Sequence, residues 1–292
     1  MTKNTPIHQL FLRFLPVTIL VAMLATFTGS VSSCNEPVAG DSTAVSSGHG
    51  NASREDLLTI IEGGWVNADY QDALLRVHSP MFAAEAGRPV QEMMFNAANM
   101  KGDTVINESG RLNYLDGERF DVVLFKEGEN VRMKIWQGAA YADKPLYLDY
   151  RIDATAGDTM LCLVNPASKD TTWYHREFRK APVKAGVAHN ALEHYVNRAL
   201  FAGEWKAQDG STVKFTADGN VSGWAKWTWF SVEIDKYGTE IQPDIMSAYN
   251  DKMGATYVYT LDNDRLSIYE YDSNTSDSAW TRGKMVIELN RK

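Results

Sequence analysis

The chain has 292 residues, a net charge of −8 and two cysteines. The excess of acidic residues argues against nucleic-acid partners and against electrostatic attraction to anionic lipid, since both require a basic surface. Cys34 ends an export-like segment and leaves Cys162 without a partner for an internal disulfide, so stability has to come from packed cores.

The first 33 residues are predicted to be a signal peptide. Lys3 and Arg13 are the only charged residues among them, and the mostly apolar stretch 17–27 follows. A helix of this length rises only about 16 Å, which is too short to span a membrane stably. A basic start, a short apolar core and small residues after it are typical of secretory leaders.

The end of this leader, Val31-Ser32-Ser33-Cys34, resembles the lipobox of bacterial lipoproteins. The resemblance implies that the Cys34 thiol is diacylated, that the chain is cleaved before Cys34, and that the new amino group is acylated. A cysteine suits this chemistry because its thiolate is strongly nucleophilic. An ordinary signal peptide with a chance cysteine is the alternative.

Two or three acyl chains on Cys34 would anchor the protein stably in a membrane. Asn35, rather than an aspartate, follows the cysteine, which favours the outer membrane in lipoprotein sorting. We therefore expect a cell-envelope protein, lipid-anchored in the outer membrane and either periplasmic or surface-exposed.

Residues 34–52 are predicted to be a flexible tether. They lack apolar periodicity and are rich in serine, glycine and alanine. Within them, Asp41-Ser42-Thr43 resembles the short O-glycosylation signal of Bacteroides-type bacteria, which makes Ser42 or Thr43 a candidate glycosylation site. A signal of three residues is also easily met by chance.

The rest of the chain repeats one plan twice, which predicts a first domain over residues 53–182 and a second over 188–292. Each begins with a short helical pattern, at residues 55–61 with Ser53 as the cap and at residues 189–200. Each helix is followed by glycine, one residue and tryptophan, and each domain closes on an alternating strand that ends in Arg-Lys. The repeated residues are Gly63, Trp65 and Arg179-Lys180 in the first domain, and Gly203, Trp205 and Arg291-Lys292 in the second.

Short alternating segments separated by turn residues predict β-strands between these ends. Asp218-Gly219 is a strong hairpin signal. The predicted strands are 121–126, 131–136, 146–152 and 160–164 in the first domain, and 212–216, 220–223, 257–261 and 265–271 in the second.

The Gly-x-Trp start after a helix, with a basic residue on the last strand, resembles the calycin group of lipocalins and fatty-acid-binding proteins. The resemblance implies a mainly β fold of two tandem antiparallel lipocalin-like barrels, each preceded by a short helix. It also implies that the tryptophan packs against the late cation, a contact worth about 0.5–2 kcal/mol. Two small open sheets or a sandwich are the alternative. The implied barrel-closing pairs are Trp65 with Arg179 or Lys180, and Trp205 with Arg291 or Lys292.

A helical insertion, residues 69–86, interrupts the first domain after its first strand. The pattern breaks at Ser79-Pro80, where serine can cap and proline can start a second helix. Two such helices resemble the lid over the barrel mouth of fatty-acid-binding proteins. A helical surface insertion is the alternative.

Catalytic motifs are missing from the sequence, which favours a non-enzymatic protein with no cofactor. It contains no Gly-x-Ser-x-Gly, phosphate loop, His-Glu-x-x-His or Cys-x-x-Cys. Cys162 lies in an apolar strand and is expected in the core. His189 and His194 are five residues apart and lie on different sides of a helix, so no metal site is predicted.

Aromatic residues are the best candidates for a ligand site. Rings on a rigid sheet can stack on sugars or hold apolar ligands, although large rings also fill small barrels. The candidates are Trp224, Trp227, Trp229, Tyr257 and Tyr259.

We expect a lipoprotein that contacts the membrane through acyl chains on Cys34 and binds an apolar or amphipathic small molecule without transforming it. A protein-interaction or inhibitor lipoprotein with filled barrels is one alternative, although its partner protein cannot be named from the sequence. Glycan binding through exposed tryptophans is another.

Overall fold

The computed structural model describes ten ranges of the chain, and all of them belong to one compact unit, residues 43–292. The predicted signal peptide, Cys34 and most of the tether lie outside the described residues. The ranges are 52–84, 86, 90–106, 111–112, 120–137, 146–153, 158–180, 190–234, 243–272 and 281–292.

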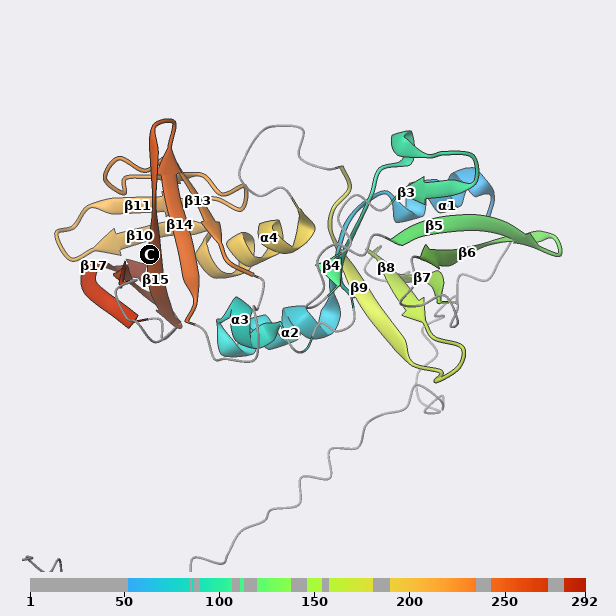
Figure 1. The fold of residues 1–292 in the computed structure, drawn as a ribbon, viewed down its shortest axis with the longest axis horizontal. Helices are drawn as coiled ribbons and strands as arrows, with labels where there is room; N and C mark the ends of the chain where they lie inside the picture. Colours follow the sequence, from blue (N-terminus) through green and yellow to red (C-terminus); the bar gives the residue numbers. More distant parts are fainter. Residues whose placement is uncertain are drawn as a thin grey trace, which may run out of the picture. The chain divides into compact units, whose positions relative to one another are not determined.

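The described residues are mainly β and form two nearly closed antiparallel barrels, as the sequence predicts (Figure 1). In the first, the strand order is β3-β5-β6-β7-β8-β9-β1-β2-β4. The edge strands β3 and β4 are separated in the chain by residues 107–110 only, so the sheet has to curl until its edges approach. Its strands are β1 Gly63–Asn67, β2 Val90–Phe95, β3 Thr104–Ile106, β4 Arg111–Leu112, β5 Phe120–Glu127, β6 Asn130–Gln137, β7 Tyr147–Asp153, β8 Asp158–Val164 and β9 Thr171–Phe178.

In the second barrel, eight strands follow one another in chain order and the last pairs with the first. A bridge between Asn220 and Trp229 joins the remaining two edges, and the Phe230 amide donates to the Gly219 carbonyl at 2.8 Å. The strands are β10 Gly203–Ala207, β11 Thr212–Phe215, β12 Val221–Ser222, β13 Trp229–Val232, β14 Ile245–Asn250, β15 Met253–Asp262, β16 Arg265–Asp272 and β17 Thr281–Arg291.

A short helix precedes each barrel, as predicted. Helix α1, Arg54–Ile61, begins with a capping box in which Ser53 and Asp56 exchange hydrogen bonds. Helix α4, Ala191–Val196, is capped by Asn190 and continues through a helical segment, η3, at Asn197–Phe201. A single turn, η1 at Ala97–Asn99, lies between β2 and β3.

The helical insertion forms two helices that break where the sequence predicts. Helix α2, Ala68–Val77, ends at His78, which has left-handed backbone geometry with φ 54°. Ser79 then caps α3, Pro80–Ala83, and accepts a hydrogen bond from the Phe82 amide.

The insertion packs against both barrels: α2 contacts β1 and β9 of the first, and its buried residues belong to a cluster shared with the second. Tyr70, Ala73 and Leu74 lie on one face of α2, at the spacing of an apolar helical stripe. Together with Ala83 they join the buried cluster that contains Trp205 and the aromatic residues of the second barrel. The core of the first barrel is a separate cluster. The comparison with a lid over the first barrel's mouth stays a prediction, since α2 contacts β1 and β9 of that barrel as well as the cluster of the second.

Candidate functional site

The tryptophan that opens the second barrel lies under an arginine from its last strand. Trp205 is fully buried, and its indole nitrogen donates to the Phe201 carbonyl at 2.7 Å. The guanidinium carbon of Arg291 lies 4.4 Å from the Trp205 ring centroid. The same guanidinium donates to the Leu200 carbonyl at 2.6 Å. Arg291 thus joins the ring to the carbonyl end of the preceding helix, where a positive charge is favourable.

The first barrel contains the same arrangement, built with a different arginine from the one predicted. The Trp65 indole donates to the Ile61 carbonyl at 2.8 Å, and the guanidinium carbon of Arg176 lies 4.4 Å from the ring centroid. Arg176 also donates to the Ile60 carbonyl. The assignment of this position to Arg179 or Lys180 is corrected.

The strand register explains the correction. Arg176 is the residue of β9 directly opposite Trp65, just as Arg291 is directly opposite Trp205. β9 continues past Arg176 to Phe178, and Arg179 follows it as an exposed residue. The terminal Arg-Lys pair therefore contains the arginine that contacts the tryptophan only in the second barrel, where Arg291 is the last residue of its strand.

The five aromatic candidates are mostly core residues. Trp224 and Trp227 are only 3% and 6% exposed, Trp229 is half-buried, and Tyr257 and Tyr259 are buried. Glycan stacking needs rings that are open to solvent, so the burial of Trp224 and Trp227 argues against that alternative.

Aromatic rings fill the interior of the second barrel. The Phe215 and Phe230 centroids are 5.0 Å apart, and Phe201 lies 5.2 Å from Tyr259 and 5.7 Å from Phe230. All three pairs meet edge to face, the arrangement that aromatic quadrupoles favour. These rings form a packed core at the place where the sequence suggested a ligand cavity.

An open cavity of about 490 Å³ lies between the helical insertion and the second barrel. This volume is within the range of small-molecule sites, which are often found at domain interfaces. One part of the wall is apolar, and the other carries a carboxylate, hydroxyls, an imidazole and a guanidinium. The lining residues are Val77, His78, Ser79, Phe82, Pro243, Asp244, Tyr259, Thr260, Leu261 and Arg282.

Asp244 is the central polar group of this wall. Its Oδ1 accepts a hydrogen bond from the Ser79 hydroxyl at 2.8 Å and a longer one from the Met81 amide at 3.4 Å. Burial raises the pKa of Asp244 to about 6, against the opposing effects of these bonds and of Arg282. The carboxylate of Asp244 is therefore mostly ionised at pH 7, although its hydrogen bonds and Arg282 do not fully offset the cost of burying its charge.

Tyr259 also lines the cavity, but its hydroxyl is buried away from it. Its side chain is 1% exposed, and its hydroxyl has no hydrogen-bond partner among the described residues. Burial, and then the negative charge of Asp244, raise the pKa of Tyr259 well above its ordinary value, so the hydroxyl stays protonated. A buried polar group without a partner costs about 1–3 kcal/mol of stability.

Sequence reasoning identified Tyr259 among its candidates and missed His78, Ser79, Asp244 and Arg282. The Ser79-Pro80 break was visible, but only as a helix start. Ser79 and Asp244 are 165 positions apart in the chain. No local spacing links two residues at that separation, and only the packing of the insertion on the second barrel brings them together.

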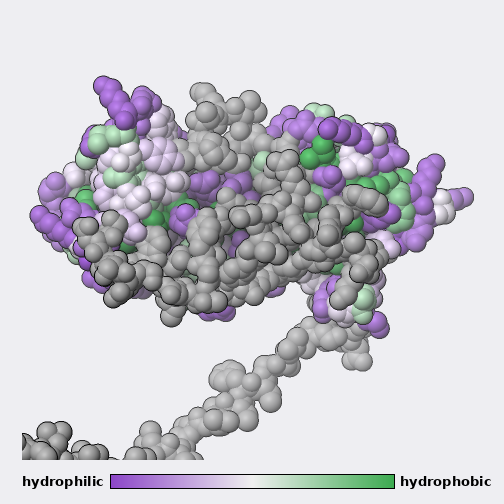
Figure 2. Space-filling model, in the orientation of Figure 1, coloured by the Kyte–Doolittle hydropathy of each residue, from purple (hydrophilic) through white to green (hydrophobic). Residues whose placement is uncertain are grey.

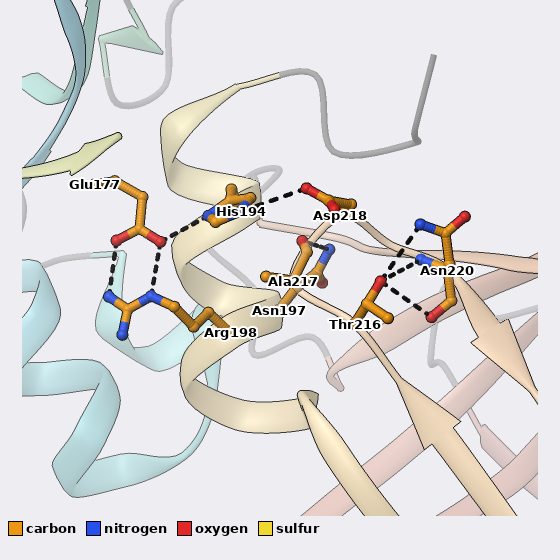
Figure 3. Close-up of polar contacts among 8 residues, drawn as sticks. All are labelled: Glu177, His194, Asn197, Arg198, Thr216, Ala217, Asp218 and Asn220. Carbon is orange, nitrogen blue, oxygen red and sulfur yellow. Dashed lines mark hydrogen bonds and ion pairs between the residues drawn. The ribbon is translucent and has the colours of Figure 1, made fainter. Parts of the chain in front are cut away.

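A second polar cluster joins the two barrels directly (Figure 3). Glu177, on β9 of the first barrel, receives two hydrogen bonds of 2.7 Å from Arg198 and contacts Nδ1 of His194 at 2.6 Å. His194 and Arg198 belong to α4 and η3, and Nε2 of His194 lies 3.5 Å from Asp218. The carboxylate of Glu177 is 2% exposed. Its partners satisfy it within the protein, so we interpret this cluster as structural.

Glu177→Gln should destabilise the protein near neutral pH. Burial raises the pKa of Glu177, but hydrogen bonds from Arg198 and His194 outweigh it and leave the pKa below its ordinary value. The stabilising contribution is therefore present above the unfolded-state pKa and is lost as the pH falls through the folded-state pKa. We expect the variant to lose about 1–3 kcal/mol of unfolding free energy at pH 7. The difference should shrink below about pH 4. Urea unfolding at both pH values measures it.

Glu204→Gln is the matched control, because Glu204 pairs with Lys292 in an exposed salt bridge. Exposed pairs contribute little, so this variant should unfold almost like the unmodified protein. If the two variants lose the same unfolding free energy, the buried interactions of Glu177 stabilise the protein no more than an exposed salt bridge does.

The remaining reactive groups give no sign of a catalytic site in the part of the chain that the structure describes. Cys162 is buried, and burial raises the pKa of its thiol to about 12, so it is unreactive at neutral pH. Among the same residues, no group of histidine, cysteine, aspartate and glutamate could hold a metal ion. No described helix is long and apolar enough to cross a membrane.

Hydrophilic residues cover much of the described surface on the face in Figure 2, with smaller apolar areas among them. Three exposed apolar residues belong to the helical insertion: Leu75, Val77 and Phe82 are 53%, 41% and 59% exposed. Two of them, Val77 and Phe82, border the cavity. The apolar part of the site is therefore continuous with an exposed apolar edge.

Comparison of the chain with protein-family models, curated proteins and solved structures finds no match.

Proposed function

We propose that this protein is a membrane-anchored lipoprotein of the cell envelope that binds an amphipathic small ligand without chemically transforming it. The cavity between the helical insertion and the second barrel is the observation that supports this function. Its apolar edge suits a hydrocarbon body, and its polar wall suits a head group.

The proposal locates the ligand outside the barrel interior. The second barrel is filled by its own aromatic rings, whereas the cavity has room for a ligand.

Val77→Trp is expected to block the site. Val77 lines the cavity and is 41% exposed, so an indole there can occupy the space of a ligand without disturbing the core. Binding of a fluorescent fatty-acid analogue should weaken by at least about tenfold, equivalent to 1.4 kcal/mol. A fluorescence titration measures the loss.

Leu75→Trp is the matched control, because Leu75 is an exposed residue of the same helix and does not line the cavity. Its affinity should remain that of the unmodified protein. The cavity is not a ligand site if the unmodified protein binds no amphiphile. The same conclusion follows if Val77→Trp and Leu75→Trp both bind as tightly as the unmodified protein.

The membrane anchor is proposed from the lipobox-like sequence that ends at Cys34. In cells fed a radiolabelled fatty acid, the unmodified protein should be labelled and shortened. Cys34→Ala should remain full-length and unlabelled, because no thiol is available for diacylation. Cys162→Ala should behave like the unmodified protein. Label on the Cys34→Ala variant would refute the assignment.

A second candidate function, a protein-interaction or inhibitor lipoprotein, is favoured by the aromatic filling of the second barrel. Such a protein presents its surface to a partner and needs no internal ligand. Leu75 and Phe82 would then be contact residues. A native mass spectrum of detergent-free protein distinguishes the two functions, since only the first predicts a bound small molecule.

A further inference from the structure

We propose that His194 is a pH-sensitive clamp between the two barrels. Its protonated ring joins a carboxylate of each barrel, and loss of the proton at alkaline pH loosens the joint. The two carboxylates belong to Glu177, on β9 of the first barrel, and to Asp218, in the turn that follows β11 of the second (Figure 3). The clamp is a property of the fold and needs no ligand in the cavity.

Each ring nitrogen of His194 faces one of these carboxylates. Nδ1 lies 2.6 Å from Oε1 of Glu177, and Nε2 lies 3.5 Å from Oδ1 of Asp218. A neutral imidazole carries a single N–H, so one of its nitrogens would direct a lone pair toward a carboxylate oxygen. The imidazolium carries a hydrogen on both nitrogens and is attracted to both carboxylates. The arrangement therefore favours the protonated ring.

The charges of the cluster balance only when His194 is protonated. Glu177 and Asp218 carry two negative charges, and the guanidinium of Arg198, bonded to both oxygens of Glu177, carries one positive charge. Arg198 opposes a second positive charge beside it, but a neutral His194 would leave one negative charge uncompensated. The carboxylate of Glu177 is 2% exposed, so water screens its charge only weakly.

His194 belongs to a helix that both barrels hold. Helix α4 packs against β1, β2 and β9 of the first barrel and against β13 of the second. A second link between α4 and the first barrel is independent of His194: Oε2 of Glu92, on β2, accepts a hydrogen bond from the Leu192 amide at 2.9 Å. Loss of the His194 proton should therefore loosen the joint without separating the barrels.

Packing restricts the His194 ring to this position. Its side chain is 17% exposed, and its ring meets the Phe178 ring edge to face at a centroid distance of 5.7 Å. Among the described residues, only Glu177 and Asp218 form ion pairs with His194. The other charged or titratable side chains on α4 and on the elements packed against it are Glu193 and Tyr195 on α4, Arg198 on η3, Glu92 on β2, and Tyr174, His175 and Arg176 on β9.

The clamp should be strongest in mildly acidic solution. Histidine ordinarily loses its proton near about pH 6.5. Because the folded arrangement favours the protonated ring, the folded state binds more protons than the unfolded state, and stability falls as the pH rises through this range. Below about pH 4 the carboxylates take up protons and the clamp is lost again.

Urea unfolding of the full chain at pH 5.5 and pH 8.5 tests the clamp. His194→Gln keeps a side chain that can donate to Glu177 but carries no charge at either pH. The unfolding equilibrium constant of this variant, divided by that of the unmodified protein, should be at least about fivefold larger at pH 5.5 than at pH 8.5. An equal ratio at the two pH values would overturn the proposal.

His175→Gln is the matched control. His175 is a half-buried histidine of β9, and it forms no ion pair with another described residue. Its ratio should be the same at both pH values within about twofold. If this control showed the pH dependence expected of His194→Gln, the effect would not come from a ring placed between two carboxylates.

Asp218→Asn tests the second carboxylate without disturbing the fold. Asp218 is 58% exposed, and Asn-Gly forms the same kind of hairpin turn as Asp-Gly. The variant should retain less than half of the pH dependence of the unmodified protein that His194→Gln removes. If it retains all of it, the proton is not held between two carboxylates and the proposal is wrong.

Hydrogen exchange locates the effect in the molecule. After correction for the intrinsic pH dependence of amide exchange, protection of residues 191–201 in the unmodified protein should fall from pH 5.5 to pH 8.5. The fall should be at least about threefold larger than that of β15 and β16, which lie away from the joint in the sheet order. A uniform fall across the second barrel would mean that the pH acts on the whole barrel, and it would overturn the assignment to the joint.

Discussion

Replacing Gly63 with alanine is expected to lower the unfolding free energy of the protein by about 3–5 kcal/mol. Gly63 has a φ of 117°, which side-chain-bearing residues rarely adopt. An added Cβ would lie 2.1 Å from the carbonyl oxygen of Phe178 on the neighbouring strand. Since that oxygen belongs to the backbone, β1 and β9 would have to separate. Chemical denaturation followed by tryptophan fluorescence measures the loss.

Gly203→Ala provides the comparison within the same protein. Gly203 begins β10 with a φ of 129°, but no atom lies within 4 Å of the position of an added Cβ. Only the backbone strain remains, so we expect a loss of about 1–3 kcal/mol. If both substitutions cost the same, strain alone explains the two glycines, and the close approach of β9 to Gly63 has no energetic effect.

Arg176→Met is expected to cost about 2–5 kcal/mol of unfolding free energy. Methionine retains much of the aliphatic volume but loses the contact of the guanidinium with Trp65, worth about 0.5–2 kcal/mol. It also leaves the Ile60 carbonyl without its charged donor, at a further cost of about 1.5–3 kcal/mol. Urea unfolding at neutral pH, with fluorescence of the tryptophans as the probe, measures the total.

Arg179→Met is the matched control. Arg179 is exposed beyond the end of β9, and its charge slightly disfavours that of Arg176. Its removal should change the unfolding free energy by no more than about 0.5 kcal/mol. If Arg179→Met loses much unfolding free energy and Arg176→Met loses little, the pairing of Trp65 with Arg179 that the sequence suggested would be restored.

Local sequence signals account for the parts of the fold that depend on neighbours in the chain. The Ser53 cap, the Ser79-Pro80 break and the Asp218-Gly219 turn each act within a few residues, and the structure has a helix start or a turn at each. The repeated Gly-x-Trp pattern predicted both barrels for a similar reason. Each first strand begins directly after a helix, and the glycine at that point, Gly63 or Gly203, has a positive φ that other residues rarely adopt.

Register across strands was less predictable. The residue that lies over Trp65 is the one directly opposite it on β9, and the register shifts between Gly64 and Trp65. Such an irregularity leaves no mark that can be read from the sequence of either strand alone. Arg291 was placed correctly because its strand ends there, and Arg176 was missed because β9 continues beyond it.

The sequence by itself determined the β-rich class, the repeat of two barrels, the short helices and the clustering of aromatic residues in the second barrel. Only the tertiary structure decided that those aromatic rings fill the barrel and that the insertion packs against both barrels. It also decided that Ser79 lies 2.8 Å from Asp244 across 165 positions of the chain. The physical reason is that periodicity and turn chemistry are local, whereas a cavity is formed by surfaces whose positions depend on the packing of the whole molecule.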